Sequence, residues 1–377
     1  MTQDADLRTP GQLIEQLLEE RGWTKRVLAI ILGIGETNLS KLVAGKRPLD
    51  AQTALALGEV FEVSPDRFMD LQKRLDLAQA RAVTRPDPTR SQRAQLFGGL
   101  PIAEMIKRGW IDADGVQDVS TVESELTRFF GAPSLSEIEF LPYAAKKTNV
   151  ATEATPKELA WLYRAKQIAS EMIVAPYSEF SAQRLLKQLK PLLSMPAEAR
   201  KVPRLLAEAG IRFLIVESLT GAKIDGACFW IGESPVIAMT MRFDRVDNFW
   251  FVLRHEIEHV IQGHGQTAVM LDTDLSTADD SAPVLDEERI ANMAAAEFCV
   301  PHEAMARFIA RKDPFFAERD ILGFSRTIGV HPGLVAGQLQ HHTGKYNRFR
   351  QHLVPIREAV APSAIVDGWG DITPVEE

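Results

Sequence analysis

Two histidines and a glutamate in the second half of the chain have the spacing of a hydrolytic metal site. His255 and His259 stand four residues apart in RVDNFWFVLRHEIEHVIQGH. Flanking apolar residues recur there at helical spacing, so both imidazoles are expected on one face of a helix: Phe249, Val252, Leu253 and Val260. An H-E-x-x-H helix of this kind offers two nitrogen ligands to one zinc ion, with Glu256 beside the metal as the base for a water molecule.

A catalytic zinc site also needs a third protein ligand and one open position. The downstream segment DEERIANMAAAEFCVP is expected to form another helix, with the acidic first turn that helix N-termini favour. It supplies two candidates, Glu287 and Glu288. We favour Glu288 because Asn292 lies one turn later on the same face, where it can orient a ligand through a hydrogen bond. Ala291 holds that place relative to Glu287, which remains the alternative.

The chemistry that follows from these parts is amide hydrolysis. Zinc lowers the pKa of its water, Glu256 takes the proton, and a peptide carbonyl is attacked. His264 is a further candidate to support the ligands, and His264 and Arg254 are the nearby candidates to stabilise the developing oxyanion, which the sequence does not identify. A metal that serves structure or sensing is the alternative to catalysis.

A second pattern, near the N-terminus, predicts DNA recognition. In KRVLAIILGIGETNLSKL, the small Ala29 precedes the turn residue Gly33 by four positions, and Leu39 and Leu42 follow it by six and nine. This is the spacing of a helix-turn-helix, although Gly35 stands where a capping side chain is expected. An ordinary helical hairpin is the alternative. Seven polar residues on and after the second helix are candidates for base and phosphate contacts: Glu36, Thr37, Asn38, Ser40, Lys41, Lys46 and Arg47.

The elements that must position these residues indicate a mainly α protein with a small β-sheet (α+β). Short β-rich runs between residues 211 and 241 predict the sheet, including a hairpin at the edge of its domain. Prolines and mixed charges predict a linker near residues 82–95. Four regions are expected: a five-helix DNA-binding domain at 1–82, a linker and helical connector at 83–200, a zincin-like metallopeptidase domain at 201–350, and a C-terminal tail at 351–377, loose after Pro362.

Composition narrows the classes of function. The 377 residues exceed the length at which single cores usually divide, and the formal net charge of -8 excludes wholesale coating of nucleic acid. No apolar run reaches the length of a membrane span, and the start lacks the features of a signal peptide. Only two cysteines occur, Cys228 and Cys299, too few for a disulfide framework. We therefore expect a cytoplasmic protein without a membrane partner.

The motifs resemble two known families. Residues from Pro10 to about Ala80, with PGQLIEQLLEERGW, LAIILGIGETNLSKLVAGKRPL and SPDRFMDLQKRLDLA, resemble xenobiotic-response-element helix-turn-helix proteins, especially HigA-like antitoxins. The region from Val202 to Gln340 resembles the ImmA/IrrE metallopeptidases through LLAEAGIRFLIV, FVLRHEIEHVIQGH, EERIANMAAAEFCVP and FSRTIGVHPGLVAGQLQ. Together these resemblances cover well over half the chain.

The second resemblance implies zinc ligation by His255, His259 and Glu288, with Glu256 as the base. It also implies cleavage of repressors. This sequence departs from the family pattern around the second histidine, where Glu258 and Val260 replace the usual Gly and Leu, and at Met293-Ala294, where a Phe is frequent. The late FSRTIGVHPGLVAGQLQ is itself a weaker helix-turn-helix pattern, for which packing against the peptidase core is the expected role.

Three functions remain open at this point. The first is a transcriptional regulator that binds a double-stranded DNA operator and, through zinc-dependent proteolysis, cleaves a repressor or itself. The second is an antitoxin-like repressor whose metal domain is an idle sensor or binds a toxin partner. The third is a peptidase whose N-terminal helices bind protein. Operator half-sites would favour a homodimer.

Overall fold

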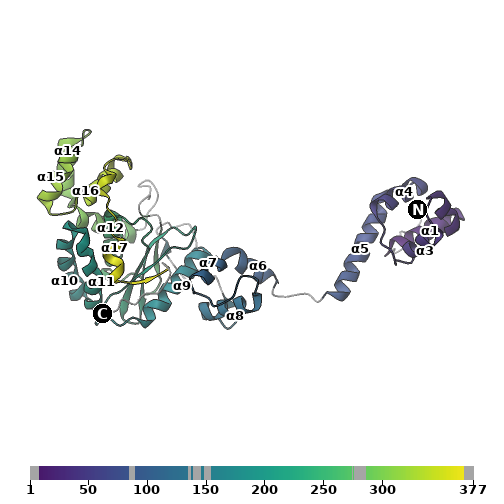
Figure 1. Cartoon of the computed structure of the whole chain (residues 1–377), viewed down its shortest axis with the longest axis horizontal. Coiled ribbons are helices and arrows are strands. Elements are labelled where there is room, and N and C mark those ends of the chain that lie inside the picture. Colours follow the sequence, from purple (N-terminus) through teal and green to yellow (C-terminus); the bar gives the residue numbers. More distant parts are fainter. Residues whose placement is uncertain are drawn as a thin grey trace. The chain divides into compact units, whose positions relative to one another are not determined.

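The computed structural model describes residues 8–84, 90–134, 137–138, 146–147, 154–273, 275 and 286–368 (Figure 1). The chain divides into two compact units, Met1–Arg90 and Ser91–Glu377. The division lies within the predicted linker at 82–95, of which residues 85–89 lie outside the described residues. In the described part of the chain no helix is long and apolar enough to cross a membrane.

The described residues 8–84 of the first unit form five helices, as the sequence predicted. Side chains of Thr9, Thr24 and Asp50 cap the N-termini of α1, α2 and α4 by accepting backbone hydrogen bonds. Gly11 permits close packing of α1 on α3, because a Cβ there would lie 1.9 Å from the carbonyl oxygen of Val43. The bounds are α1 (Pro10–Arg21), α2 (Lys25–Ile31), α3 (Glu36–Val43), α4 (Ala51–Phe61) and α5 (Pro65–Val83).

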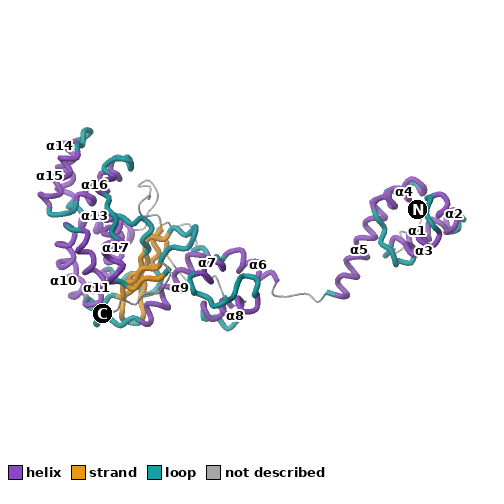
Figure 2. Tube along the Cα trace, in the orientation of Figure 1, coloured by secondary structure: helices purple, strands orange, loops and turns teal. Residues whose placement is uncertain are grey.

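The second unit is built on a mixed sheet, shown in orange in Figure 2, with the order β1-β5-β3-β4-β2-β6 in the described residues. β3 pairs antiparallel with β4 and β5, whereas β2 pairs parallel with β4 and β6, and β1 pairs parallel with β5. The strands are β1 (Lys146–Lys147), β2 (Arg212–Val216), β3 (Ile224–Ile231), β4 (Ser234–Met239), β5 (Met270–Thr273) and β6 (Ile365–Asp367).

Two expectations about this sheet were wrong. The β3–β4 hairpin lies at the centre of the sheet rather than at an edge, because β5 and β2 pair with its outer sides. The stretch after Pro362 is not a loose tail up to residue 367, because β6 pairs with β2 and buries Val366 and Asp367. Both errors arise because the short strands that pair with the hairpin and with β2 give no sign of their partners in the local sequence.

Helices cover both faces of the sheet. Along β2 the buried side chains alternate, so that Phe213 and Ile215 join one apolar cluster while Leu214 and Val216 join the other. α7, α8 and α9 contribute to the second cluster, and α10 to α17 contribute to the first. The helices are α6 (Arg90–Gly99), α7 (Ile102–Lys107), α8 (Val119–Phe130), α9 (Pro156–Glu171), α10 (Glu179–Leu189), α11 (Val202–Glu208), α12 (Val246–Ile261), α13 (Asp286–Cys299), α14 (His302–Lys312), α15 (Glu318–Ile328), α16 (Pro332–Thr343) and α17 (Arg357–Val360), with 3-10 turns at Lys190–Ser194, Pro196–Lys201, Arg350–His352 and Ala361–Ser363.

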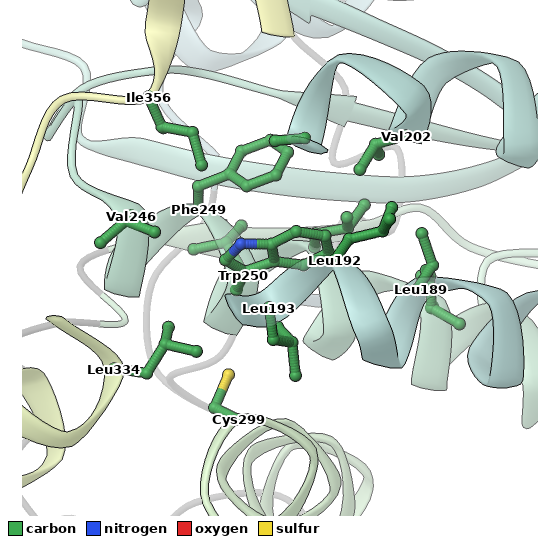
Figure 3. Packing of buried hydrophobic residues seen from close by; sticks show 14 of the residues in the cluster. Leu189, Leu192, Leu193, Val202, Val246, Phe249, Trp250, Cys299, Leu334 and Ile356 are labelled. Atoms are coloured by element: carbon green, nitrogen blue, oxygen red, sulfur yellow. The ribbon is translucent and has the colours of Figure 1, made fainter. Parts of the chain in front are cut away.

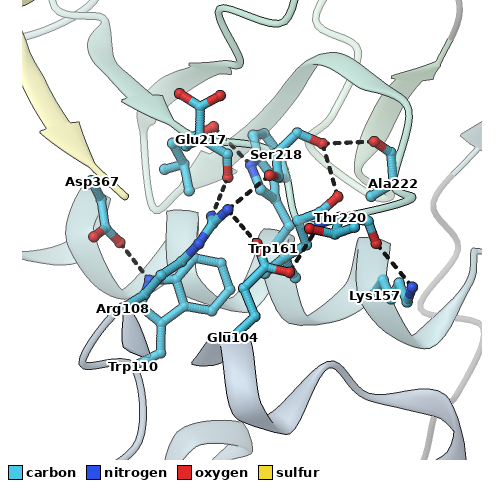
Figure 4. Close-up of polar contacts among 12 residues, drawn as sticks. Glu104, Arg108, Trp110, Lys157, Trp161, Glu217, Ser218, Thr220, Ala222 and Asp367 are labelled. Carbon is cyan, nitrogen blue, oxygen red and sulfur yellow. Dashed lines mark hydrogen bonds and ion pairs between the residues drawn. The ribbon is translucent and has the colours of Figure 1, made fainter. Parts of the chain in front are cut away.

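The predicted helical connector is part of this second unit. Arg108, which follows α7, donates to the carbonyl oxygens of Glu217 and Ser218 at 2.7 and 2.9 Å (Figure 4). Trp161 on α9 donates to the carbonyl of Val216, and Trp110 donates to the Asp367 carboxylate. These bonds tie the segment after α7, and α9, to the ends of β2 and β6, so the described part of the predicted connector supports the sheet.

The helix that carries the H-E-x-x-H motif, α12, is anchored by a large apolar contact. Phe249 and Trp250 are almost fully buried among side chains from several segments, with Leu192, Leu193 and Leu334 nearby (Figure 3). α16, the second helix of the weaker helix-turn-helix pattern, packs against α12 as expected. Its Gly337 allows the close approach, because a Cβ there would lie 2.3 Å from the Asp247 carboxylate.

Candidate metal centre and nucleic-acid interface

The two histidines of α12 face one another inside the second unit. Both side chains are fully buried, and the Nε2 atoms of His255 and His259 are 2.9 Å apart. The separation of four residues on a helix produces this arrangement, because it sets the two side chains one above the other. Two imidazole nitrogens that converge in this way can share one metal ion.

A glutamate from α13 completes the predicted set. The Glu288 oxygens lie 3.3 Å from Nε2 of His255 and 3.5 Å from Nε2 of His259, and its side chain is fully buried. Neither oxygen accepts a hydrogen bond of good geometry from the described residues. Glu287, the alternative, is only half-buried and is not in the cluster. The structure thus brings together the three ligands favoured from the sequence.

A fourth donor was missed. Asp272 of β5 is fully buried, and its Oδ2 lies 3.3 Å from Nε2 of His255 and 3.9 Å from Nε2 of His259. It has no helical spacing to the histidines, and only the pairing of β5 with β3 brings it to the site. The one available signal was an acidic residue in a short apolar run, AVMLDTD.

These four residues fit a small divalent metal ion. Their donor atoms all lie within 4.8 Å of one another. In a tetrahedral zinc site with bonds of about 2.0–2.1 Å, neighbouring donor atoms are about 3.3 Å apart, close to the separations found here. Two imidazoles and two carboxylates are also donors that zinc accepts.

The charges of the cluster call for a cation. Burial lowers the pKa of His255, but the Asp272 and Glu288 carboxylates outweigh it and raise that pKa to about 10. Burial opposes the ionisation of Asp272, yet the two histidines hold its pKa below the usual value. A proton on His255 therefore supplies the positive charge that the carboxylates attract, at the place where a metal ion would bind.

Glu256 lies beside this cluster on the same helix. Its carboxyl packs against β3 at Gly226, where a Cβ would lie 2.0 Å from Oε1. Burial raises the pKa of Glu256 well above its ordinary value, and the charge of Asp272 and a hydrogen bond to it raise it further. Gly226 is a residue that sequence reasoning missed, since a strand glycine alone does not identify what it accommodates.

Two further predicted residues contact the histidines. Asn292 Oδ1 lies 3.0 Å from Nδ1 of His255, so the ring can donate through the nitrogen that faces away from the cluster. His264 Nδ1 lies 2.9 Å from Nδ1 of His259. Arg254 is instead hydrogen-bonded to Glu258 at 2.7 Å and is outside the metal cluster.

The first unit exposes its predicted functional residues. Ala29, Leu39 and Leu42 are buried, and Gly33 has a φ of 65°, which fits the turn between α2 and α3. Gly35 begins α3 without a side-chain cap, as expected. All seven candidate contact residues are exposed on α3 or after it: Glu36, Thr37, Asn38, Ser40, Lys41, Lys46 and Arg47. Lys41 therefore lies on the same solvent-facing surface as Thr37 and Asn38.

Comparison with known proteins identifies the first unit. The chain is 32% identical over 71 residues to the uncharacterized HTH-type transcriptional regulator YddM of Escherichia coli K12, an alignment that covers 19% of this chain and 76% of that protein. A helix-turn-helix family model matches residues 14–68. The chain belongs to the HTH-type transcriptional regulators.

A second family model, described as the IrrE N-terminal-like domain of peptidase family M78, matches residues 207–321 of this regulator. The match begins just before β2 and ends in α15, so it includes α12, β5 and α13, the three elements that form the metal cluster. Both family resemblances expected from the sequence are thereby confirmed. The regulator combines a helix-turn-helix domain with a peptidase-like domain that holds a buried cluster able to bind a metal ion.

Proposed function

We propose that this regulator binds an operator through its N-terminal unit and cleaves a repressor, or itself, through a zinc-dependent endopeptidase site. The observation that carries the proposal is the convergence of His255, His259 and Glu288 next to Glu256 in a domain of peptidase family M78. His255, His259 and Glu288 would hold the zinc ion. A regulator that destroys a repressor relieves repression irreversibly, which binding alone does not achieve.

Each residue of the site has a distinct task in this proposal. A bound zinc ion would supply the Lewis acidity that activates water and polarises the peptide carbonyl. Glu256 accepts a proton from the attacking water and returns it to the leaving amine. Asn292 and His264 orient the two ligating imidazoles through their Nδ1 atoms.

The N-terminal unit would read DNA with α3. We propose that Glu36, Thr37, Asn38, Ser40 and Lys41 reach base edges or phosphates from the major groove. Lys46 and Arg47, in the following loop, would contact phosphates. Because Arg47 lies only 3.6 Å from the exposed carboxylate of Asp50, contact with a phosphate would exchange one anionic partner for another. Two palindromic half-sites would require a homodimer.

The test of the peptidase is Glu256→Gln. Full-length protein with one equivalent of zinc is incubated alone, and with repressors encoded by neighbouring genes, and products are identified by mass spectrometry. We expect Glu256→Gln to reduce cleavage by about 10²–10⁴-fold, since it removes the proton acceptor. Zinc content and operator binding should not change. Glu258→Gln is the matched control, because Glu258 lies on the same helix and pairs with Arg254. Equal cleavage by Glu256→Gln and Glu258→Gln would contradict the proposed activity.

A second function is favoured by Asp272. Four protein donors describe a closed metal site, which is typical of structural zinc rather than catalytic zinc. We therefore keep as the alternative an antitoxin-like repressor whose metal domain is a sensor or binds a partner such as a toxin. The two functions differ in cells: unchanged derepression in a Glu256→Gln strain would favour the sensor, whereas loss of derepression would favour proteolysis.

A further inference from the structure

The proposed peptidase mechanism assigns no task to Asp272. The residue is fully buried and belongs to the same cluster of donor atoms as the three proposed ligands. Its Oδ2 is as close to Nε2 of His255, at 3.3 Å, as the nearer Glu288 oxygen is. From Nε2 of His259 it is somewhat farther, at 3.9 Å against 3.5 Å for Glu288, so Asp272 lies within the range of a ligand beside Glu288.

The sheet register fixes Asp272 next to the proposed base. Asp272 is the cross-strand partner of Gly226, and the Glu256 carboxyl occupies the space that a Gly226 side chain would fill. The Glu256 carboxyl and Asp272 are therefore neighbours at the Gly226–Asp272 pair of the sheet. A base needs its water between itself and the metal, and this is the side of the cluster on which the Asp272 carboxylate lies.

The charge of the buried site is compatible with four protein ligands. A zinc ion with two neutral imidazoles and one carboxylate carries a net charge of about +1, and a second carboxylate, whether Asp272 or an ionised Glu256, brings the sum to zero. An uncompensated buried charge is costly, and the cluster residues are fully buried. Arg242, close to the nearby Asp225 at 3.4 Å, does not change this balance, since the two charges offset each other.

We propose that Asp272 is a fourth protein ligand, which closes the metal centre at rest and must leave the metal before a peptide can be cleaved. The proposal rests on the zinc-dependent function stated above and adds a regulatory step to it. A carboxylate from the regulator's own β5 then competes with substrate for the metal. Cleavage would occur only when substrate binding or a change in the domain displaces Asp272.

Metal binding and access to the metal test this proposal without any need for a substrate. Zinc affinity is measured by competition with a chromophoric chelator for the full-length wild type, Asp272→Asn and Asp272→Ala. Loss of an outer hydrogen bond to a ligand already lowers affinity about tenfold to a hundredfold, so loss of a ligand should cost at least tenfold. Asp225→Asn is the matched control, because Asp225 is an equally buried acid on β3 outside the cluster. An affinity of both Asp272 variants within about threefold of the wild type would overturn the proposal.

Access is measured on cobalt-substituted protein by its visible spectrum. Acetohydroxamate, a small chelating ligand, should leave the wild-type spectrum unchanged and shift that of Asp272→Ala, because only the variant has an open position. A shift of the wild-type spectrum on addition of acetohydroxamate overturns the closed state, and this result needs no folded variant. A wild type that binds no zinc contradicts the proposed function itself. Zinc binding by a wild type that is open to acetohydroxamate contradicts the fourth ligand alone.

Discussion

The two domains of this regulator differ in how far their candidate functional residues are exposed to solvent. On α3 the candidate DNA contacts are exposed, and the residues buried beneath them are apolar. On α12 the motif residues His255, Glu256 and His259 are fully buried. A surface that must meet a large, charged duplex has to be accessible before binding. A metal site gains from exclusion of water, which strengthens every electrostatic interaction within it.

This difference predicts how each domain responds to substitution. Buried polar residues depend on one another, so the loss of one disturbs the whole cluster. Exposed residues act almost independently, and each should alter binding by a small amount. Because the chain divides into two compact units, effects in one should leave the readout of the other unchanged.

The largest effect is expected from His259→Ala. Removing a ligand should lower zinc affinity by more than ~100-fold, beyond the loss seen for outer hydrogen-bonding partners. Zinc is measured by chelator competition and by metal analysis of the purified protein. His342→Ala, at an exposed histidine of α16, is the control. Operator binding should remain intact, and its loss would show that the two domains depend on each other.

Gly226→Ala should separate the base from the metal. The added Cβ would lie 2.0 Å from Glu256 Oε1, so the carboxyl must move. A displacement of about 1 Å can cost ~100-fold in rate, while the ligands stay in place. Cleavage should therefore fall far more than zinc content. Gly323→Ala, where a Cβ has no heavy atom within 4 Å, is the control. A parallel loss of zinc would mean that the sheet, rather than Glu256 alone, had shifted.

Asn292→Ala should have an intermediate effect. It removes the acceptor 3.0 Å from Nδ1 of His255, which orients that ring. Zinc affinity should fall about 10–100-fold. Asn292→Asp keeps an acceptor and should restore most of the affinity. If both variants bind zinc as the wild type does, the hydrogen bond has no part in metal binding.

The smallest effect is expected on the exposed surface. Lys41→Ala should weaken operator binding to a similar extent for all sequences and reduce the slope of log affinity against log salt by about one, as loss of one phosphate contact does. Fluorescence anisotropy over a range of salt concentrations measures it. Lys73→Ala, at an exposed lysine of α5, should leave the slope unchanged. An unchanged slope for Lys41→Ala would remove this lysine from the DNA interface.

Local sequence was sufficient to predict those features whose residues all lie within one helix. The five helices of the first unit and the placement of His255, Glu256 and His259 follow from apolar spacing and helix punctuation, and the two family resemblances were confirmed. Glu288 was chosen by its relation to Asn292 on the same helix. These inferences need only the period of an α-helix. The roles of the metal ligands and DNA contacts stay predictions.

The pairing of the strands and the close approach of α12 to β3 were decided only by the tertiary structure. Asp272 reaches the cluster because β5 pairs with β3, and Gly226 matters because α12 passes directly over it. β6 joins the sheet from far along the chain, and α7 to α9, which were predicted as a helical connector, pack on one face of the sheet. Pairing between distant short strands leaves no periodic trace in sequence. The choice between an open and a closed metal site therefore depends on β5, not on the H-E-x-x-H motif.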